Sequence, residues 1–148
     1  LSLAENFANG EDVAVILGDN CTDANIKKDV EKFIGGGMVF LKEVDDPRRF
    51  GVPIMIDDKI TAIEEKPIDL KSNLAVTGLY LYDNSVFDKI RQIKPSARGE
   101  LEITDVNNLY IKEGTLNWAI LDGYWSDCGI FSSLLQTNIY WGDKEGLI

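Results

Sequence analysis

A carboxylate that follows a predicted strand is the first candidate for chemistry. Val13–Leu17 is a continuous apolar run rich in β-branched residues, and it stops at Gly18-Asp19-Asn20. A glycine there leaves room beside the backbone for a metal ion or a phosphate, and a carboxylate oxygen is a ligand for hard divalent cations. Asp19 is therefore a candidate metal ligand. The alternative is that Asp19 only caps the turn in which it lies.

A second aspartate has a similar setting near the other end of the chain. Asp127 lies in Trp125-Ser126-Asp127-Cys128-Gly129, after an apolar stretch and before a predicted helix. It is therefore either the N-cap of that helix or a second metal ligand. If it lies near Asp19 in space, the two carboxylates form a cradle for Mg²⁺, which usually keeps waters and takes further ligands from substrate phosphates.

Two charged segments are candidates for binding a sugar and a phosphate. In Glu64-Glu65-Lys66-Pro67 the proline ends a predicted strand, so Glu65 and Lys66 are displayed at its edge. A carboxylate suits sugar hydroxyls, and an ammonium suits a phosphate. The loop 94–100 contains Arg98, whose guanidinium can bind phosphate oxygens through parallel hydrogen bonds. By themselves, these segments equally fit an exposed charged turn and a basic loop.

Strands that alternate with helices must position these groups. Apolar runs and turn residues predict strands over 13–17, 38–44, 51–56, 59–64, 74–82 and 116–121, and helices over about 3–8, 25–33, 85–93, 101–112 and 130–140. This order predicts an α/β domain with a mostly parallel mixed sheet, helices on both faces and inserted hairpins. Ligands of such sheets bind outside the carboxyl ends of the strands, where Gly18-Asp19-Asn20 lies.

Composition excludes several classes of function. The 148 residues predict a single domain spanning 1–148, and 25 acidic against 15 basic residues give a net charge of −10. That charge argues against nucleic acid or an anionic membrane as partner, and no apolar run approaches the roughly 20 residues that span a bilayer. The absence of histidine excludes histidine-based triads and histidine-ligated zinc. Two cysteines predict a reducing, cytoplasmic location rather than a disulfide framework.

Several segments of the chain, taken together and in order, match one family. They are Leu17-Gly18-Asp19-Asn20, Asp46-Pro47-Arg48-Arg49-Phe50-Gly51-Val52, Ile63-Glu64-Glu65-Lys66-Pro67, Ala75-Val76-Thr77-Gly78-Leu79-Tyr80, Arg98-Gly99-Glu100-Leu101-Glu102-Ile103-Thr104-Asp105-Val106-Asn107 and Trp125-Ser126-Asp127-Cys128-Gly129. Together they resemble the sugar-1-phosphate nucleotidyltransferase family, most closely its thymidylyltransferase branch that uses glucose 1-phosphate. The resemblance covers nearly the whole chain and fades after about Thr137.

The resemblance implies a role for each matching residue. Asp19 and Asp127 would hold the Mg²⁺ that bridges the nucleotide phosphates. The implied substrate-binding residues are Leu17, Gly51, Glu65, Lys66, Val76, Arg98 and Glu100. Glu65 would bind glucosyl hydroxyls, whereas Lys66 and Arg98 would hold the sugar phosphate and are the implied catalytic residues.

The resemblance also implies a reaction and a fold. The reaction is Mg²⁺-dependent transfer of a nucleotidyl group from dTTP or UTP to glucose 1-phosphate, with release of pyrophosphate. The fold is the three-layer, Rossmann-like α/β fold of nucleotide-diphospho-sugar transferases, in a homo-oligomer whose other partners are small molecules. Because the attacking phosphate oxygen is already anionic, the reaction needs no general base. A chain without histidine can therefore catalyse it by aligning the reactants and screening the charge of their phosphates.

The family's glycine-rich nucleotide loop has no match in these residues. We therefore expect the chain to be the later, incomplete part of a single larger nucleotidyltransferase domain. The alternative is a non-catalytic sugar-phosphate-binding or regulatory module, or an inactive fragment of such an enzyme.

Overall fold

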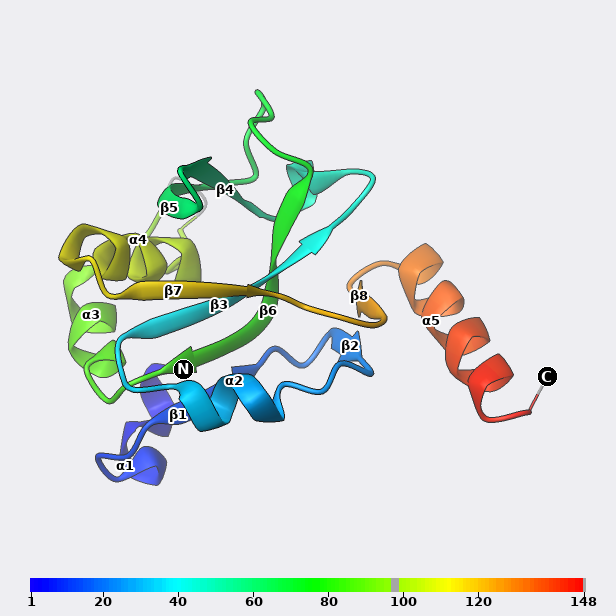
Figure 1. Cartoon of the computed structure of the whole chain (residues 1–148), viewed down its shortest axis with the longest axis horizontal. Coiled ribbons are helices and arrows are strands. Elements are labelled where there is room, and N and C mark those ends of the chain that lie inside the picture. The colour runs from blue at the N-terminus through cyan, green and yellow to red at the C-terminus, as the bar shows by residue number, and fades with distance from the viewer. Residues whose placement is uncertain (97–98, 148) are drawn as a thin grey trace.

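The computed structural model describes residues 1–96 and 99–147, which form a curled sheet flanked by helices (Figure 1). Its elements, in chain order, are η1 (Ser2–Ala4), α1 (Glu5–Ala8), β1 (Val13–Ile16), β2 (Asn20–Thr22), α2 (Lys27–Lys32), β3 (Gly37–Glu43), η2 (Pro47–Arg49), β4 (Gly51–Ile56), β5 (Lys59–Glu65), β6 (Leu74–Tyr82), α3 (Val86–Gln92), α4 (Ile103–Glu113), β7 (Leu116–Ile120), β8 (Trp125–Asp127) and α5 (Phe131–Lys144). The predicted elements are therefore present, and β6 has its predicted bounds.

The long strand β6 organises the main sheet, whose order is β5-β4-β6-β3-β7. β3 pairs with one edge of β6 over nearly its whole length, from Gly37 opposite Tyr82 to Glu43 opposite Leu74. The other edge is shared: β1 pairs with residues 79–82 of β6, and β4 pairs with Val76. β1 therefore ends, and β4 begins, beside the same short stretch of β6.

The expected mostly parallel sheet is wrong, because the sheet is mostly antiparallel and curled (Figure 1), although the mixed α/β class is confirmed. Among the described strands only β3 and β7 pair in parallel, whereas β6 runs antiparallel to β1, β3 and β4. A buried apolar strand has the same composition in either direction, so the sequence pattern did not distinguish them. The turn between β4 and β5 also reverses the chain directly, with positive φ angles of 48° at Asp57 and 59° at Asp58.

Alternating side chains of the sheet build a core on each face. On one face Val39, Leu41 and Tyr82 pack with residues of α3 and α4, among them Phe87 and Tyr110. The opposite face is lined by Phe40, Leu79, Leu81 and Leu121, against which Ala24, Ile26 and Phe33 pack on either side of α2. Residues that alternate along a strand point to opposite faces, which is why β3 contributes to both clusters.

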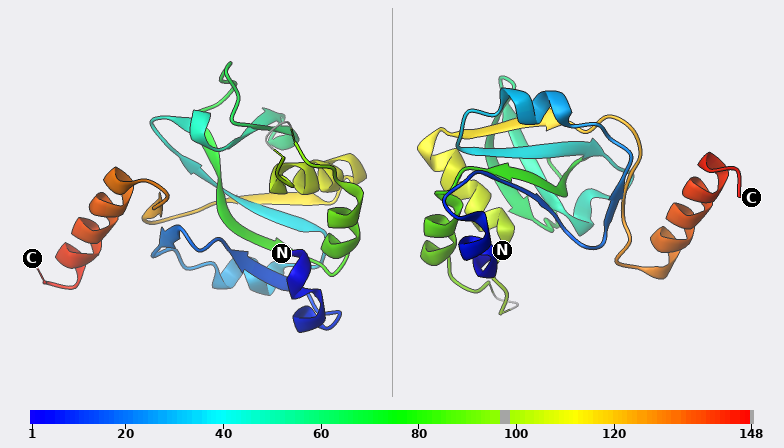
Figure 2. Two further views of the ribbon diagram at one scale, coloured as in Figure 1. Left: turned by 180° about the vertical axis from the view of Figure 1, so that it is seen from behind. Right: turned by 90° about the horizontal axis from the view of Figure 1, so that it is seen from below.

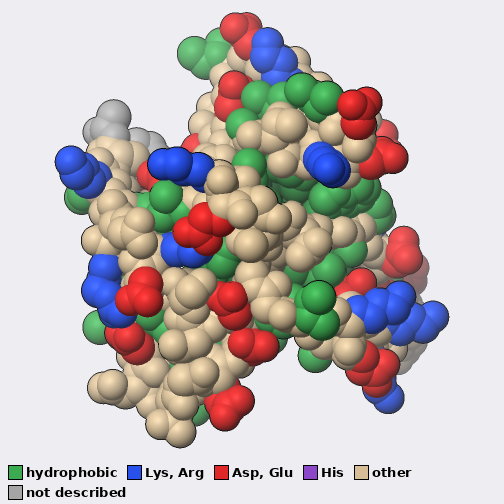
Figure 3. Space-filling model, turned by 60° about the vertical axis from the view of Figure 1, so that its left-hand side comes forward, with side chains coloured by type: hydrophobic (Ala, Val, Ile, Leu, Met, Phe, Trp, Pro, Cys, Tyr) green, Lys and Arg blue, Asp and Glu red, His purple; other side chains and the backbone are tan. Residues whose placement is uncertain are grey.

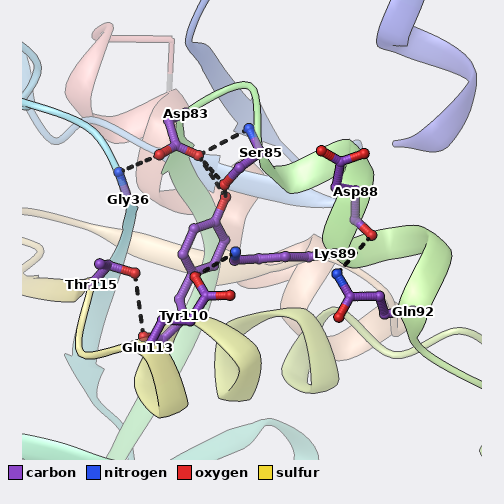
Figure 4. A network of polar contacts seen from close by, with 9 residues as sticks. All are labelled: Gly36, Asp83, Ser85, Asp88, Lys89, Gln92, Tyr110, Glu113 and Thr115. Atoms are coloured by element: carbon purple, nitrogen blue, oxygen red, sulfur yellow. Dashed lines mark hydrogen bonds and ion pairs between the residues drawn. The ribbon is translucent and has the colours of Figure 1, made fainter.

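Asp83, directly after β6, joins β3, α3 and α4 in a polar network (Figure 4). Its carboxylate accepts hydrogen bonds from the Gly36 amide at 2.7 Å, from both the amide and the hydroxyl of Ser85, and from the Tyr110 hydroxyl at 3.0 Å. Burial alone would raise the pKa of this carboxyl, but the donated hydrogen bonds outweigh burial and hold the pKa below its ordinary value. Nearby, the buried Lys89 ammonium lies 4.4 Å from the Tyr110 ring centroid.

The helix α5 lies at the edge of the molecule, beside the small sheet formed by β2 and β8, as the views in Figures 1 and 2 agree. Asp23 connects it to the body, because its carboxylate accepts hydrogen bonds from the Tyr124 amide, the Tyr140 hydroxyl and the Lys144 ammonium. These donors, chiefly Lys144, hold the pKa of the Asp23 carboxyl well below its usual range. The ring of Tyr124 also stacks on that of Tyr140 with centroids 3.8 Å apart.

The charged side chains on the surface are of mixed sign, as a chain with 25 acidic and 15 basic residues leads one to expect. On the face drawn in Figure 3, Lys and Arg side chains are interspersed with Asp and Glu and form no continuous basic patch. Within the described ranges, the structure has no helix that is both long enough and apolar enough to cross a membrane.

Candidate functional site

A cavity of about 170 Å³ opens where β1 ends and β4 begins. It is lined by Leu17, Asn20, Arg49, Phe50, Gly51, Glu65, Lys66, Val76, Gly78, Tyr80, Ile103, Thr104, Trp125 and Asp127. Six predicted site residues, far apart in the sequence, therefore meet around one space: Leu17, Gly51, Glu65, Lys66, Val76 and Asp127. A larger cavity of about 600 Å³, between the β4–β5 turn and α4, contains none of them.

Backbone pairing explains why three of these residues converge. The Leu17 amide donates a hydrogen bond of 2.8 Å to the Gly78 carbonyl, which continues the β1–β6 pairing by one residue. Gly51 pairs with Glu65 on β5 and with Val76 on β6. Val76 and Gly78 of β6 therefore form one wall of the cavity, with Leu17 and Gly51 at its two ends.

The Glu65 carboxylate is positioned by a neighbour on α4. The hydroxyl of Thr104, a buried residue, donates a hydrogen bond of 2.6 Å to Glu65 Oε2. A β-carbon on Gly51 would lie 3.2 Å from the Thr104 hydroxyl and 3.6 Å from Glu65 Oε2. The glycine thus lets both groups lie against the β4 backbone, where the carboxylate can accept hydrogen bonds from a polyhydroxyl ligand.

Lys66 leaves the end of β5 in an uncommon backbone conformation. Its φ angle is 46°, in the left-handed region, and its amide donates a hydrogen bond of 3.0 Å to the Phe50 carbonyl. A residue without the freedom of glycine rarely adopts this conformation, and such residues are concentrated at functional sites. The turn places both Glu65 and Lys66 at the cavity.

The two aspartates proposed as metal ligands lie together because β2 and β8 pair. Asn20 lies opposite Asp127 in that ladder, and the Cys128 amide donates a hydrogen bond of 2.7 Å to the Asp19 carbonyl. A β-carbon on Gly129 would lie 2.9 Å from Asp127 Oδ1 and 3.5 Å from Asp19 Oδ2. The two carboxylates therefore flank one small space that a glycine leaves open.

Asp127 does not cap α5. The helix begins at Phe131 with Ile130 at the N-cap position, and the Asp127 carboxylate instead accepts a hydrogen bond of 2.9 Å from the Gly129 amide. The alternative in which Asp127 serves as an N-cap is therefore wrong.

Asn20 is a residue of this site that the sequence did not reveal. Its Oδ1 accepts hydrogen bonds from the Gly78 amide at 2.9 Å and from Trp125 Nε1 at 2.7 Å. Its Nδ2 donates to Asp19 Oδ1 at 2.9 Å. One amide side chain therefore connects a candidate metal ligand to the wall of the cavity. Only the three-residue strands β2 and β8 bring these groups together, and strands so short leave no periodic pattern in a sequence.

Two predicted substrate-binding residues are not brought to the cavity by the described structure. Arg98 lies outside the described residues. Glu100 is exposed in the loop before α4, where its carbonyl accepts a hydrogen bond of 2.8 Å from the Ser96 amide, and it does not line the cavity. Both assignments remain predictions.

Acidic and basic groups are balanced around the cavity. Its lining contains the carboxylates of Glu65 and Asp127 and the cations of Arg49 and Lys66. Burial raises the pKa of the Tyr80 phenol well above its usual range, and the negative charges of Glu65 and Asp19 raise it further. Tyr80 is therefore a neutral hydroxyl at neutral pH. An anionic ligand held here needs cations to offset these carboxylates.

The donor set fits Mg²⁺ that is shared with a substrate. No group of three or more acidic or cysteine side chains is arranged to hold a metal within residues 1–96 and 99–147. Asp19 and Asp127 supply two carboxylates, and Mg²⁺ is commonly bound through one or two carboxylates together with substrate phosphates and waters. The pair is therefore suited to a phosphate-bridged ion and not to a closed protein cage.

The chain is similar in sequence to known nucleotidyltransferases. A family model described as "Nucleotidyl transferase" matches residues 1–142. The chain is 41% identical over 139 residues to a glucose-1-phosphate thymidylyltransferase of Neisseria meningitidis, covering 89% of this chain and 48% of the relative. It is 35% identical over 140 residues to a low-salt glycan biosynthesis nucleotidyltransferase of Haloferax volcanii, covering 91% of this chain and 39% of the relative. The chain spans between a third and about half of the length of the curated relatives it matches.

Solved structures agree with this similarity. A chain from Bacillus anthracis, described as a candidate glucose-1-phosphate thymidylyltransferase in complex with a sucrose, superposes with a TM-score of 0.87 at 48% identity. The match covers 94% of this chain and 58% of the other. An apo UDP-glucose pyrophosphorylase superposes with a TM-score of 0.83 at 24% identity, covering 97% of this chain and 59% of the other. At that identity the second match establishes the fold alone.

Proposed function

Because this chain belongs to the nucleotidyl transferase family, we propose that it forms the sugar-phosphate and metal-binding part of a glucose-1-phosphate thymidylyl- or uridylyltransferase. In the proposed reaction a phosphate oxygen of glucose 1-phosphate attacks the α-phosphorus of dTTP or UTP. A phosphorus–oxygen bond forms to the sugar phosphate, and the bond to pyrophosphate breaks. The proposal rests on one observation: residues from β2, β4, β5, β6 and β8, together with Leu17 directly after β1, converge on a single cavity.

The cavity has the groups that the acceptor substrate requires. We assign the sugar to the wall formed by Leu17, Gly51 and Val76, with its hydroxyls donating to Glu65. Thr104 holds one Glu65 oxygen in place, so the carboxylate is oriented before the sugar binds. The Lys66 ammonium then binds the phosphate at the edge of the same cavity, and Arg98 is proposed as a further phosphate ligand on the basis of the family resemblance.

The chain's own residues can orient the reactants without a proton acceptor. A sugar phosphate is already anionic at neutral pH, so the site has to align two phosphates and offset their charge, and a general base is not needed. When bound to Asp19 and Asp127, Mg²⁺ would supply charge neutralisation and a fixed geometry for the nucleotide phosphates. Asn20 orients Asp19 for that role through the hydrogen bond from its Nδ2.

A non-catalytic sugar-phosphate-binding or regulatory module is the second candidate. The residues that converge on the cavity suit sugar-phosphate binding whether or not nucleotidyl transfer follows, so turnover has to distinguish the two candidates. Under either candidate we retain the proposals of a homo-oligomer and a cytoplasmic location.

Calorimetry tests the binding half of the proposal on the chain as it stands. We expect glucose 1-phosphate to bind more tightly with Mg²⁺ than without it, and glucose alone to bind much more weakly. No binding of glucose 1-phosphate at millimolar concentration contradicts both candidates.

Turnover separates the enzyme from the module. The chain, and a fusion that adds the part of the Neisseria relative that it does not span, are incubated with Mg²⁺, glucose 1-phosphate and either dTTP or UTP. Release of pyrophosphate supports the transferase. Binding of glucose 1-phosphate without any release in either protein supports the module and contradicts the transferase.

A further inference from the structure

Arg49 lies between two cavities and has no role in the proposed site so far. It lines the site cavity together with Glu65 and Lys66. It also lines a neighbouring cavity of about 380 Å³, and the two cavities share Phe50, Trp125 and Asp127 as further wall residues. Arg49 is therefore at the junction of the two spaces, beside one of the two candidate metal ligands.

The Arg49 side chain is held at this junction by two contacts. Its Nη2 lies 3.5 Å from Asp127 Oδ1. Its guanidinium carbon lies 5.4 Å from the centroid of the Phe50 ring, and that ring packs edge-on against Trp125 with centroids 5.2 Å apart. An oriented guanidinium loses less conformational entropy when it binds a ligand than a freely moving one.

Arg49 and Lys66 reach the cavity from the same end of the β4–β5 ladder. Gly51 pairs with Glu65 at that end, and the Lys66 amide donates to the carbonyl of Phe50, the residue that follows Arg49. Arg49 is the last residue of η2, two positions before β4, and Lys66 directly follows β5, so both cations adjoin the same end of the ladder and line one cavity. Such an arrangement suits a single anionic group held between them.

The guanidinium retains donors for a ligand. Across residues 1–96 and 99–147, the only ion pair of Arg49 is the one through Nη2. A guanidinium has five N–H groups in a fixed plane, and it binds phosphate oxygens through two parallel hydrogen bonds. Its side chain is 39% exposed, so these donors are accessible from the cavities.

We propose that Arg49 is a phosphate-binding residue, which pairs with Asp127 and, together with Lys66, holds a phosphate group at the junction of the two cavities. The proposal rests on the proposed function and extends it by assigning a second described cation to the phosphate. The phosphate can belong to the sugar phosphate or to the pyrophosphate part of the nucleotide. The two sources share one chemistry and are separated by the experiment.

The test compares Arg49→Gln with Arg48→Gln. Arg48 is the matched control, because it adjoins Arg49, carries the same charge and pairs with Asp46 at 3.4 Å, but lines neither cavity. Glucose 1-phosphate and pyrophosphate are titrated separately in calorimetry with Mg²⁺, after thermal melts show that both variants are folded. We expect Arg49→Gln to lower the affinity for at least one of the two ligands about tenfold or more. Arg48→Gln should lower the affinity for each ligand less than about twofold.

The ligand affected identifies the phosphate. Weaker binding of glucose 1-phosphate assigns Arg49 to the phosphate of the acceptor substrate. Weaker binding of pyrophosphate assigns Arg49 to the phosphates of the nucleotide donor. An Arg49→Lys variant, which keeps the charge but loses the planar fork, is expected to recover part of the affinity. Equal losses of affinity in Arg48→Gln and Arg49→Gln, or no loss of affinity in Arg49→Gln, overturn the proposal while leaving the proposed function intact. If the unmodified chain binds neither ligand, the proposed function and the inference both fail.

Discussion

Replacing Gly78 with alanine tests whether Asn20 has to lie where the structure places it. A β-carbon on Gly78 would lie 2.5 Å from Asn20 Nδ2 and 2.7 Å from Oδ1, so the amide must move by roughly 1 Å to reach ordinary contact distance. That movement breaks the hydrogen bonds that Asn20 accepts from the Gly78 amide and from Trp125 Nε1.

The cost follows from those two bonds. Each contributes about 0.5–1.5 kcal/mol, and a buried N–H left without an acceptor costs about 1–3 kcal/mol. The lower entropy of alanine in the unfolded chain offsets about 0.4–1 kcal/mol. We therefore expect Gly78→Ala to lower the free energy of unfolding by about 2–3 kcal/mol and the Tm by roughly 5–10 °C.

Urea unfolding followed by circular dichroism measures this change. Gly18→Ala is the matched control, since a β-carbon there meets nothing within 4 Å and the backbone needs no positive φ; we expect it to change the free energy by less than about 0.5 kcal/mol. Asn20→Ala should remove the clash, so the double variant should be about 2 kcal/mol more stable than the sum of the single effects predicts. Additive effects, or a Gly78→Ala variant as stable as the Gly18→Ala control, would refute the reasoning.

Three further predictions concern the site and the fold. Thr104→Val removes the hydroxyl that donates to Glu65, so glucose 1-phosphate should bind about tenfold more weakly and Thr104→Ser should restore binding; unchanged affinity in the valine variant contradicts this. Replacing a residue that only hydrogen-bonds to a metal ligand lowers metal affinity by at least about tenfold. Asp127→Asn should lower the Mg²⁺ affinity measured by calorimetry by more than that, whereas replacement of the exposed Asp69 by asparagine should leave it unchanged. Equal Mg²⁺ affinities of the two variants would contradict the metal role of Asp127. Because the pKa of Asp83 is below its ordinary value of 3.8, its stabilisation is complete above that pH and is lost as the pH falls through the folded-state pKa. Asp83→Asn should therefore flatten the loss of unfolding free energy below about pH 4 in urea titrations; an unchanged acid slope argues against the network.

The elements that the sequence predicts well are those whose pattern is local. β6 is a nine-residue, mostly apolar strand bounded by turn residues, and the β4–β5 hairpin is marked by Asp57-Asp58 between two short strands. The αL residue Asn9 ends α1 where the sequence predicts a helix end. Each of these signals depends on residues a few positions apart, so one sequence contains it in full.

Strand direction and the small β2–β8 sheet depend on contacts between distant segments. The alternation of strands and helices suggested parallel pairing. In the structure β3 and β4 run in the same direction, the β4–β5 turn reverses the chain, and β6 runs antiparallel to both β3 and β4. Nothing near Asn20 in the sequence indicates that Trp125 and Gly78 donate to it. The family resemblance predicted a common site for Asp19 and Asp127, whereas Asn20, Arg49 and Thr104 became visible only from the three-dimensional contacts.

The most direct test of the central claim maps glucose 1-phosphate onto the chain by NMR. In the presence of Mg²⁺, titration of the ¹⁵N-labelled chain should shift the amide signals of Gly51, Lys66 and Val76, which line the site cavity. The signals of Lys59 and Asn117, in the cavity of about 600 Å³, should stay unchanged. Shifts confined to Lys59 and Asn117, or no shifts at saturating ligand, would contradict the assignment of the sugar-phosphate site.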